Sequence, residues 1–254
     1  TAANRADIAG NTASGFRYLG HLYSATVTAN GELGPIDPTG IGPNDGSALD
    51  DNLFTASGQL AVDWTISQPA DGMQLGSGRY GLTVPSGRRL AIALGAMLWT
   101  YPSIFGGDLI VNGTLQTAGT VSEPTVVRTA TTSGVPGSVS VNTTAGTPLT
   151  LSNVRFANTQ LVVRGSGAVT LNRVSADGFS GSVVTFGGAV DLDVSGAIQI
   201  TDTSIANVSS DDYASLRVVQ RGNFGTSLTR TSVTGGKGPR AVDIVVISAS
   251  ASAP

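Results

Sequence analysis

The sequence predicts an all-β protein whose C-terminal half forms a parallel β-helix, and three observations support this prediction. Only 12% of the 254 residues are charged while 40% are hydrophobic, whereas soluble domains carry about 25% charged residues. The polar surface is mostly Thr, Ser, Asn and Gly, and 34 Gly and 11 Pro supply turns. A ten-residue phrase occurs four times after residue 148. No apolar run approaches the ~18–20 residues of a membrane-spanning helix, so we expect no membrane span.

Residues 1–52 are expected to form an N-terminal arm or attachment segment. Residues 1–23 contain the one helix candidate, in which Ile8, Ala13 and Phe16 could share a face. Residues 31–51 carry Gly, Pro, Asp and Asn at the density that is typical of a long ordered loop.

Residues 53–107 have a strand-like pattern. Residues 59–66 alternate apolar and polar side chains over most of their length, and residues 80–92 read as strand, tight turn and strand around the Pro-Ser-Gly at 85–87. This segment is expected to be either a small β domain or the first coils of the helix.

Residues 108–254 are expected to form the β-helix because of the repeated phrase. Its copies read LTLSNVRFAN at 149–158, VTLNRVSADG at 169–178, IQITDTSIAN at 198–207 and TSLTRTSVTG at 226–235. Their starts are separated by 20, 29 and 28 residues. That length accommodates three short strands and their corners, which return the chain beside a parallel neighbour about 4.8 Å away.

Stacking of such coils would bury apolar faces that no single coil can bury alone. One interior column should contain Leu151, Leu171, Ile200 and Leu228, and a second should contain Val154, Val174 and either Ile205 or Val233. A β-sandwich whose strands happen to recur is the alternative architecture.

The phrase L-x-L-x-N-V-x-F-x-N at 149–158 and its echoes resemble rungs of the pectate-lyase-like right-handed β-helix. The arrangement as a whole resembles spike or fibre proteins of tailed phages and phage-derived particles. The rung resemblance covers about residues 108–247. It implies a right-handed helical shaft behind a smaller β-rich attachment region, and a location on a virion or an extracellular surface.

Metal, nucleophile and nucleic-acid functions are poorly supported by the sequence. Cysteine is absent and His21 is the single histidine, which we interpret as a packed or capping side chain. No phosphate-binding or dinucleotide-binding motif is present, and the net charge of −3 gives no electrostatic footprint for nucleic acid. We therefore expect no cofactor, no metal and no nucleic-acid partner.

Paired carboxylates are the remaining route to catalysis, because glycoside hydrolysis uses two carboxyl groups. Asp191 and Asp193 share one face of a strand, since they are two residues apart. Asp202, with Asp211 or Asp212, is the other candidate and could lie near the pair one rung on. We interpret Asp191 and Asp193 as an outward, solvated polar ladder.

Aromatic side chains gather in the N-terminal half, and Trp99, Tyr101 and Phe105 occur in an apolar connection. We interpret this stretch as an inter-subunit contact, with the core of a domain junction as the alternative.

Three functions remain. The first is a homo-oligomeric structural spike, fibre or decoration protein that binds a capsid or tail protein and contacts host-surface glycan. The second is a polysaccharide-binding module or glycan depolymerase, and the third is a bacterial surface adhesin segment. We favour the first, a non-enzymatic role, because no catalytic constellation accompanies the repeat.

Overall fold

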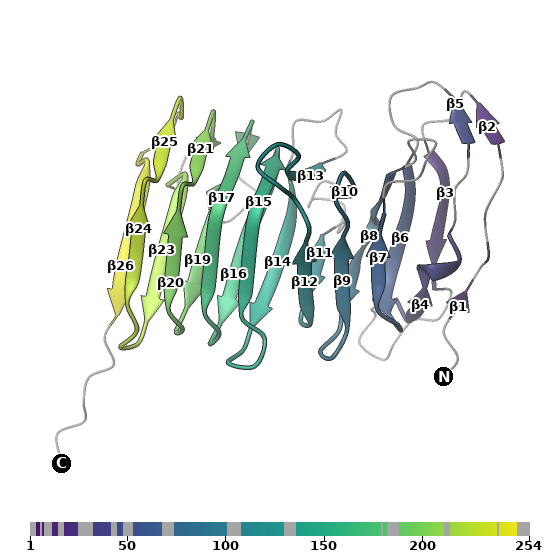
Figure 1. The fold of residues 1–254 in the computed structure, drawn as a ribbon, viewed down its shortest axis with the longest axis horizontal. Coiled ribbons are helices and arrows are strands. Elements are labelled where there is room, and N and C mark those ends of the chain that lie inside the picture. Colours follow the sequence, from purple (N-terminus) through teal and green to yellow (C-terminus); the bar gives the residue numbers. More distant parts are fainter. Residues whose placement is uncertain are drawn as a thin grey trace, which may run out of the picture.

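The computed structural model describes residues 4–5, 7, 12–14, 18–24, 33–41, 45–47, 53–67, 74–100, 108–129, 136–178, 180–181, 188–210, 214–237 and 239–247. Figure 1 shows them as a row of strands that follow one another along the long axis of the molecule. Within the described residues, the named strands pair in parallel throughout. The chain is therefore a right-handed parallel β-helix, and the β-sandwich alternative is wrong.

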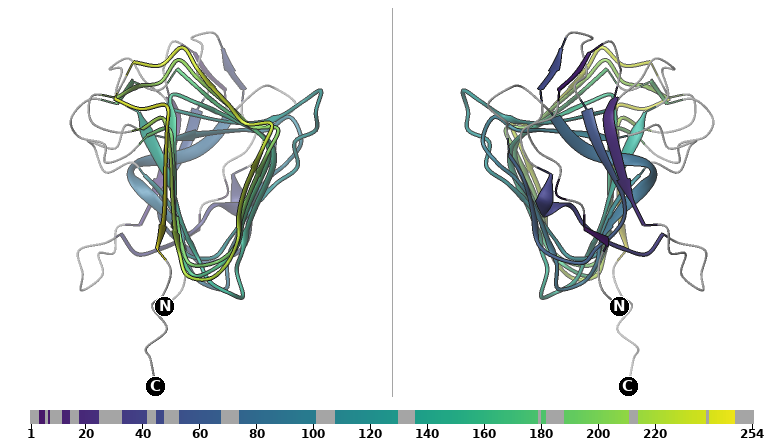
Figure 2. Two further views of the ribbon diagram at one scale, coloured as in Figure 1. Left: turned by 90° about the vertical axis from the view of Figure 1, so that its left-hand side faces the viewer. Right: turned by 90° about the vertical axis from the view of Figure 1, so that its right-hand side faces the viewer.

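Each coil has three sides, which give the roughly triangular outline of Figure 2. The first face contains β1 (Asn4–Arg5), β4 (Pro35–Asp37), β11 (Leu109–Val111), β14 (Gly137–Thr143), β16 (Thr159–Gly165), β19 (Val190–Val194), β23 (Leu216–Arg221) and β26 (Val242–Ile247). The second face contains β7 (Trp64–Ile66), β9 (Arg89–Ile92), β12 (Thr114–Thr117), β20 (Ile198–Thr201) and β24 (Thr226–Thr229). The third face contains β3 (Tyr18–Tyr23), β10 (Met97–Thr100), β13 (Thr125–Thr129), β21 (Ser204–Ala206) and β25 (Ser232–Thr234).

Four long strands turn a corner and belong to two faces. β6 (Leu53–Leu60) and β8 (Gln74–Val84) connect the third face to the first, and β15 (Leu149–Ala157) and β17 (Val169–Asp177) connect the second face to the third. Two small pairs stand apart from the faces, β2 (Thr12–Ser14) with β5 (Asp45–Ser47) and β18 (Ser180–Gly181) with β22 (Ser209–Ser210). The short 3₁₀ helix η1 (Pro38–Gly40) follows β4.

The core is a set of apolar columns that run along the helix axis. On the first face, register aligns Val84, Val111, Val141, Val163, Leu192, Val218 and Ile244. From Val84 to Val218 these side chains are at most 4% exposed. Successive side chains of a strand point to opposite faces of the sheet. Each strand therefore contributes its apolar side chains to the interior columns and directs the intervening side chains outward.

The first column expected from the phrase is confirmed. Leu151, Leu171, Ile200 and Leu228 are aligned in successive coils. In the second column, Val154 and Val174 are aligned as expected. Placing Ile205 or Val233 beside them is wrong, because these two residues align with Phe156 and Ala176 in a further column.

Left-handed backbone conformations shape two of the corners. The fifth residue of each phrase has φ near +50°, namely Asn153, Arg173, Asp202 and Arg230, and the tenth residue has positive φ as well, namely Asn158, Gly178, Asn207 and Gly235. The phrase is therefore one strand, a left-handed residue, a second strand and a second left-handed residue.

The parallel ladder also includes the described strands of the N-terminal half. β1 pairs with β4, β4 with β6, β6 with β8, and β8 with β11. The ladder thus includes described strands on both sides of the two boundaries that the sequence suggested, and β6, β8 and β10 are coils of the same helix. The helix candidate in residues 1–23 is wrong where the chain is described, because Thr12–Ser14 and Tyr18–Tyr23 are strands, and Ile8 and Phe16 lie outside the described residues.

Candidate functional site

A cluster of charged side chains lies on the outer side of the first face, around β19. Strand alternation directs Val190, Leu192 and Val194 into the core and Asp191 and Asp193 outward. In register, Asp191 lies between Val162 of β16 and Arg217 of β23, and Asp193 lies between Arg164 and Val219.

Asp191 accepts hydrogen bonds from two arginines in neighbouring coils. Nη2 of Arg164 donates to one carboxylate oxygen at 2.7 Å, and Nη1 of Arg217 donates to the other at 2.9 Å. The side chain of Asp191 is only 3% exposed. The expected outward direction is correct, but the expected solvation is wrong because the two guanidinium groups take the place of water.

Asp193 is engaged by a third arginine. Nε and Nη2 of Arg221 donate to its two oxygens, the second at 2.9 Å. These hydrogen bonds, together with the charges of Arg221, Arg164 and Arg217, lower the pKa of Asp193 against the opposing effect of burial. Asp191, Asp193, Arg164, Arg217 and Arg221 therefore form one ion-pair network, which we call the β19 network.

Asp202 is not part of the β19 network. It occupies the left-handed corner between β20 and β21, where the second face meets the third. Its carboxylate accepts from Nε and Nη2 of Arg230 in the next coil, and this contact lowers its pKa. The structure brings Asp191 and Asp193 together and places Asp202 at a different corner of the coil. Asp211 and Asp212 lie outside the described residues.

The chemistry available to these carboxylates is restricted. A glycosidase acid must hold a proton at working pH, which requires a raised pKa, whereas the pKa values of Asp193 and Asp202 are lowered. Both oxygens of Asp191 accept guanidinium hydrogen bonds, and its side chain is only 3% exposed. These carboxylates form ion pairs that link one coil to the next, an arrangement that we call a brace.

Trp99 lies on β10 with its side chain outside the core columns, yet it is only 3% exposed. The guanidinium carbon of Arg128, its register partner on β13, lies 4.2 Å from the ring centroid, which is a cation–π contact. Tyr101 and Phe105 lie outside the described residues, so the contact expected for all three remains a prediction.

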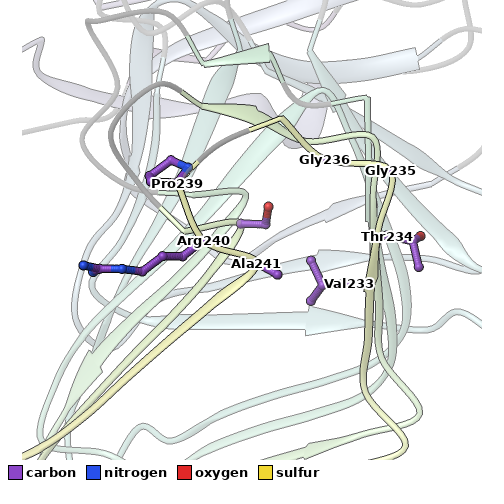
Figure 3. A pocket seen from close by; sticks show the side chains of 8 residues that line it. Val233, Thr234, Gly235, Gly236, Pro239, Arg240 and Ala241 are labelled. Atoms are coloured by element: carbon purple, nitrogen blue, oxygen red, sulfur yellow. The ribbon is translucent and has the colours of Figure 1, made fainter.

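Two hollows are present on the described surface. The second face is split between β12 and β15, since β12 pairs with β9 while the first part of β15 pairs with β17. A groove of about 520 Å³ occupies the split, and polar side chains line much of it, including Arg89, Thr114, Gln116, Thr150 and Ser152. A second hollow of about 350 Å³ lies at the last coil beside Val233, Arg240 and Ala241 (Figure 3).

The described part of the chain contains neither a metal-binding cluster nor a membrane-spanning helix. No group of three or more His, Asp or Glu side chains in that part of the chain could hold a metal ion. In the same residues, no helix is long and apolar enough to cross a membrane. Comparisons with protein-family models, with curated proteins and with solved structures find no match to this chain.

The arginines of the network were not identified from the sequence. The signal that could have found them is spacing, because Arg164 precedes Asp191 by 27 residues, Arg217 follows it by 26, and Arg221 follows Asp193 by 28. These separations are within two residues of one coil, which is 29 residues long from β16 to β19 and 26 from β19 to β23. Opposite charges about one coil apart on an outward strand therefore indicate an ion pair between coils.

Proposed function

We propose that this chain is a structural shaft, a homo-oligomeric protein of the spike, fibre or decoration type. The observation that carries the proposal is the continuous parallel ladder, in which apolar columns run from Val84 to Ile244. A solenoid whose coils each contact their neighbours is a rigid rod, suited to hold a surface at a distance.

The state of the carboxylates supports a structural role over a depolymerase. Asp191 and Asp193 are held by Arg164, Arg217 and Arg221. An acid–base pair would need one protonated carboxyl group and room for substrate or water. In the β19 network the pKa of Asp193 is lowered, and guanidinium groups occupy the oxygens of both carboxylates.

The outer side of the second face supports packing against other surfaces. Register aligns Thr150, Thr170, Gln199 and Ser227 in one outward column, and Ser152, Asn172, Thr201 and Thr229 in the next. These eight side chains form a wall that offers hydrogen-bonding groups and carries no charge. A like copy or a neutral glycan can approach such a wall without desolvating an ion.

The spike or fibre setting, with a capsid or tail protein as attachment partner and a virion or extracellular location, depends on the resemblance of the rung phrases to β-helical spike proteins. The fold is compatible with that setting.

Polysaccharide binding is a second candidate, and the groove between β12 and β15 favours it. Its hydroxyl and amide groups, with the guanidinium of Arg89, match the hydrogen-bonding groups of a sugar. We expect Arg89→Ala to weaken retention on a glycan array at least about fivefold if this groove binds glycan. Retention equal to that of the wild type would exclude Arg89 from binding.

The proposal is tested by two readouts on the full chain. Light scattering should give a mass that is a multiple of the 25.5 kDa of one chain, and surface polysaccharides incubated with the protein should keep their length on size-exclusion chromatography. A monodisperse 25.5 kDa species would contradict the oligomer. Polysaccharide shortening that a folded Asp193→Asn variant loses would establish the depolymerase instead.

A further inference from the structure

The parallel ladder of the second face is interrupted between β12 and β15, which belong to adjacent coils. β12 pairs with β9 and the first part of β15 pairs with β17, but no pairing in the described residues joins β12 to β15. The same two coils are continuous on the other faces, because β11 pairs with β14 and β13 pairs with β15. The groove of about 520 Å³ therefore opens within a single face of the helix.

Asparagine side chains close both ends of this groove. At the corner with the first face, Nδ2 of Asn142 donates to Oδ1 of Asn112 at 2.7 Å. At the corner with the third face, Nδ2 of Asn153 donates to the carbonyl oxygen of Gly119 at 3.0 Å. The two rims separate between these hydrogen bonds, so the groove follows the strands and crosses the helix axis.

The rims present backbone groups that have no strand partner in the described chain. In a strand, alternate residues direct their N–H and C=O groups to opposite sides. Thr114 and Ala118 donate to β9, and Leu149 donates to the residue before β17. The intervening residues therefore direct these groups into the groove, namely Leu115 and Thr117 on one rim and Thr150 and Ser152 on the other. Such groups require a hydrogen-bonding partner.

The groove combines polar rims with apolar side chains and a balanced charge. Leu115 and Pro148 line it, and Leu115 is 7% exposed whereas its register partner Leu90 is 0% exposed. Arg89 is the charged residue of the lining, and its Nε lies 3.6 Å from a carboxylate oxygen of Asp63. This balance favours a ligand without net charge.

A sugar chain matches these features. A hydroxyl group both donates and accepts hydrogen bonds, so it can serve an N–H on one rim and a C=O on the other. Sugar hydroxyls can enter the groove from outside, with the ring against Leu115 and Pro148. A peptide strand would have to lie in the plane of the sheet, where the two asparagine hydrogen bonds close the ends of the groove.

We propose that the groove between β12 and β15 binds a neutral glycan whose chain lies along the strands and therefore across the shaft. Its hydroxyl groups replace the hydrogen bonds that are missing between the two strands. The four residues of β12 span about 13 Å, so the groove holds only a short stretch of the chain. This inference rests on polysaccharide binding, the second candidate function, and adds the class of glycan and its direction.

The first test blocks the groove. Thr150→Arg places a long side chain at an exposed position of the rim, while Ser204→Arg adds the same side chain at an exposed position on the third face and is the matched control. On an array of neutral and acidic oligosaccharides, wild type and Ser204→Arg should retain the same neutral glycans. Thr150→Arg should retain them at least about tenfold more weakly, as expected for the loss of more than one hydrogen bond.

Each other outcome of the array overturns a different part of the inference. Equal retention by a folded Thr150→Arg protein would overturn the groove as the site and leave polysaccharide binding to another surface. Retention of acidic glycans alone would overturn the neutral class. Retention of no glycan would overturn both this inference and the polysaccharide-binding candidate, while the structural shaft is tested separately by its mass.

The second test uses the wild-type chain and reports the direction of the glycan. Calorimetric titration with oligomers of the most strongly retained glycan, from disaccharide to octasaccharide, measures affinity against chain length. Affinity should rise until the oligomer exceeds the roughly 13 Å of β12 and should then stay constant within about twofold. A rise that continues to the octasaccharide would overturn the crosswise direction, because a chain along the helix axis gains contacts with every further coil.

Discussion

Asp191 illustrates how a charge becomes buried on the outside of a β-helix. The arginines that cover it come from the coil before and the coil after, and each contributes one hydrogen bond to a different oxygen. A buried carboxylate without partners would be costly, so Arg164 and Arg217 are required wherever Asp191 is charged. The network thus ties three consecutive coils together.

Removing the charge of Asp191 should destabilise the protein. Asp191→Asn leaves Arg164 and Arg217 facing a neutral amide, and we expect a loss of about 2–4 kcal/mol, at or below the cost of breaking a buried pair because both arginines are partly exposed. Urea unfolding monitored by circular dichroism measures the change. Asp63→Asn is the control, since Asp63 and Arg89 are both about half exposed, and a loss as large as that of Asp191→Asn would refute the brace.

The pair of Asp193 with Arg221 should make stability depend on pH in the acid range. The folded pKa of Asp193 is lowered, so its contribution is fully present above the unfolded pKa of about 3.9 and is lost as pH falls through the folded value. The difference in unfolding free energy between wild type and Asp193→Asn should be constant above about pH 5 and should shrink below about pH 4. A difference that grows on acidification would contradict this pairing.

At the scale of the elements, the corners decide how closely coils stack. Gly196 lies at the corner between the first and second faces, where an added Cβ would lie 2.4 Å from the carbonyl carbon and oxygen of Gly167. That distance is shorter than any tolerable contact. The backbones of successive coils touch at this position, so only glycine fits.

Gly196→Ala should therefore destabilise the helix strongly, by about 3 kcal/mol or more, because backbone atoms cannot move aside as a side chain can. Gly225→Ala is the matched control at the same corner one coil later, since a Cβ there would meet nothing within 4 Å, and it should change stability by less than about 0.5 kcal/mol. Thermal unfolding of both variants measures the difference. Equal melting temperatures would show that the corners are looser than described.

At the corner that contains Asn153, the contribution of backbone conformation to stability can be separated from that of a hydrogen bond. Asn153 has φ of 53° and donates from Nδ2 to the carbonyl oxygen of Gly119 at 3.0 Å. Asn153→Gly keeps the left-handed conformation and loses the hydrogen bond, costing about 1 kcal/mol, while Asn153→Ala also adds about 1 kcal/mol of backbone strain. Chemical denaturation of both variants provides the comparison, and an alanine variant as stable as the glycine variant would contradict the strain.

At the scale of the whole molecule, the sequence predicted an interior column of the helix, because that column follows from the alternation of apolar and polar residues. Leu151, Leu171, Ile200 and Leu228 were placed in one column because each is the third residue of its phrase. The corner residues Arg173 and Arg230 were not recognised, because arginine has no preference for positive φ.

The extent of the helix and the charged network were harder to predict for one shared reason. Coil length varies with the corner loops, so Leu161 pairs with Val190 after 29 residues but Val190 pairs with Leu216 after 26. The sequence alone does not give the register. Arg217 therefore could not be placed beside Asp191, and the strands before residue 108 could not be assigned to coils. The N-terminal coils also lack the phrase, so their pairing could not be read from a repeat.

The central claim, that this chain is a shaft that acts as a homo-oligomer, is tested most directly by electron microscopy of the purified full chain at micromolar concentration. Class averages should show two or more rods in a fixed, symmetric arrangement. Single rods with no recurring neighbour would contradict the account.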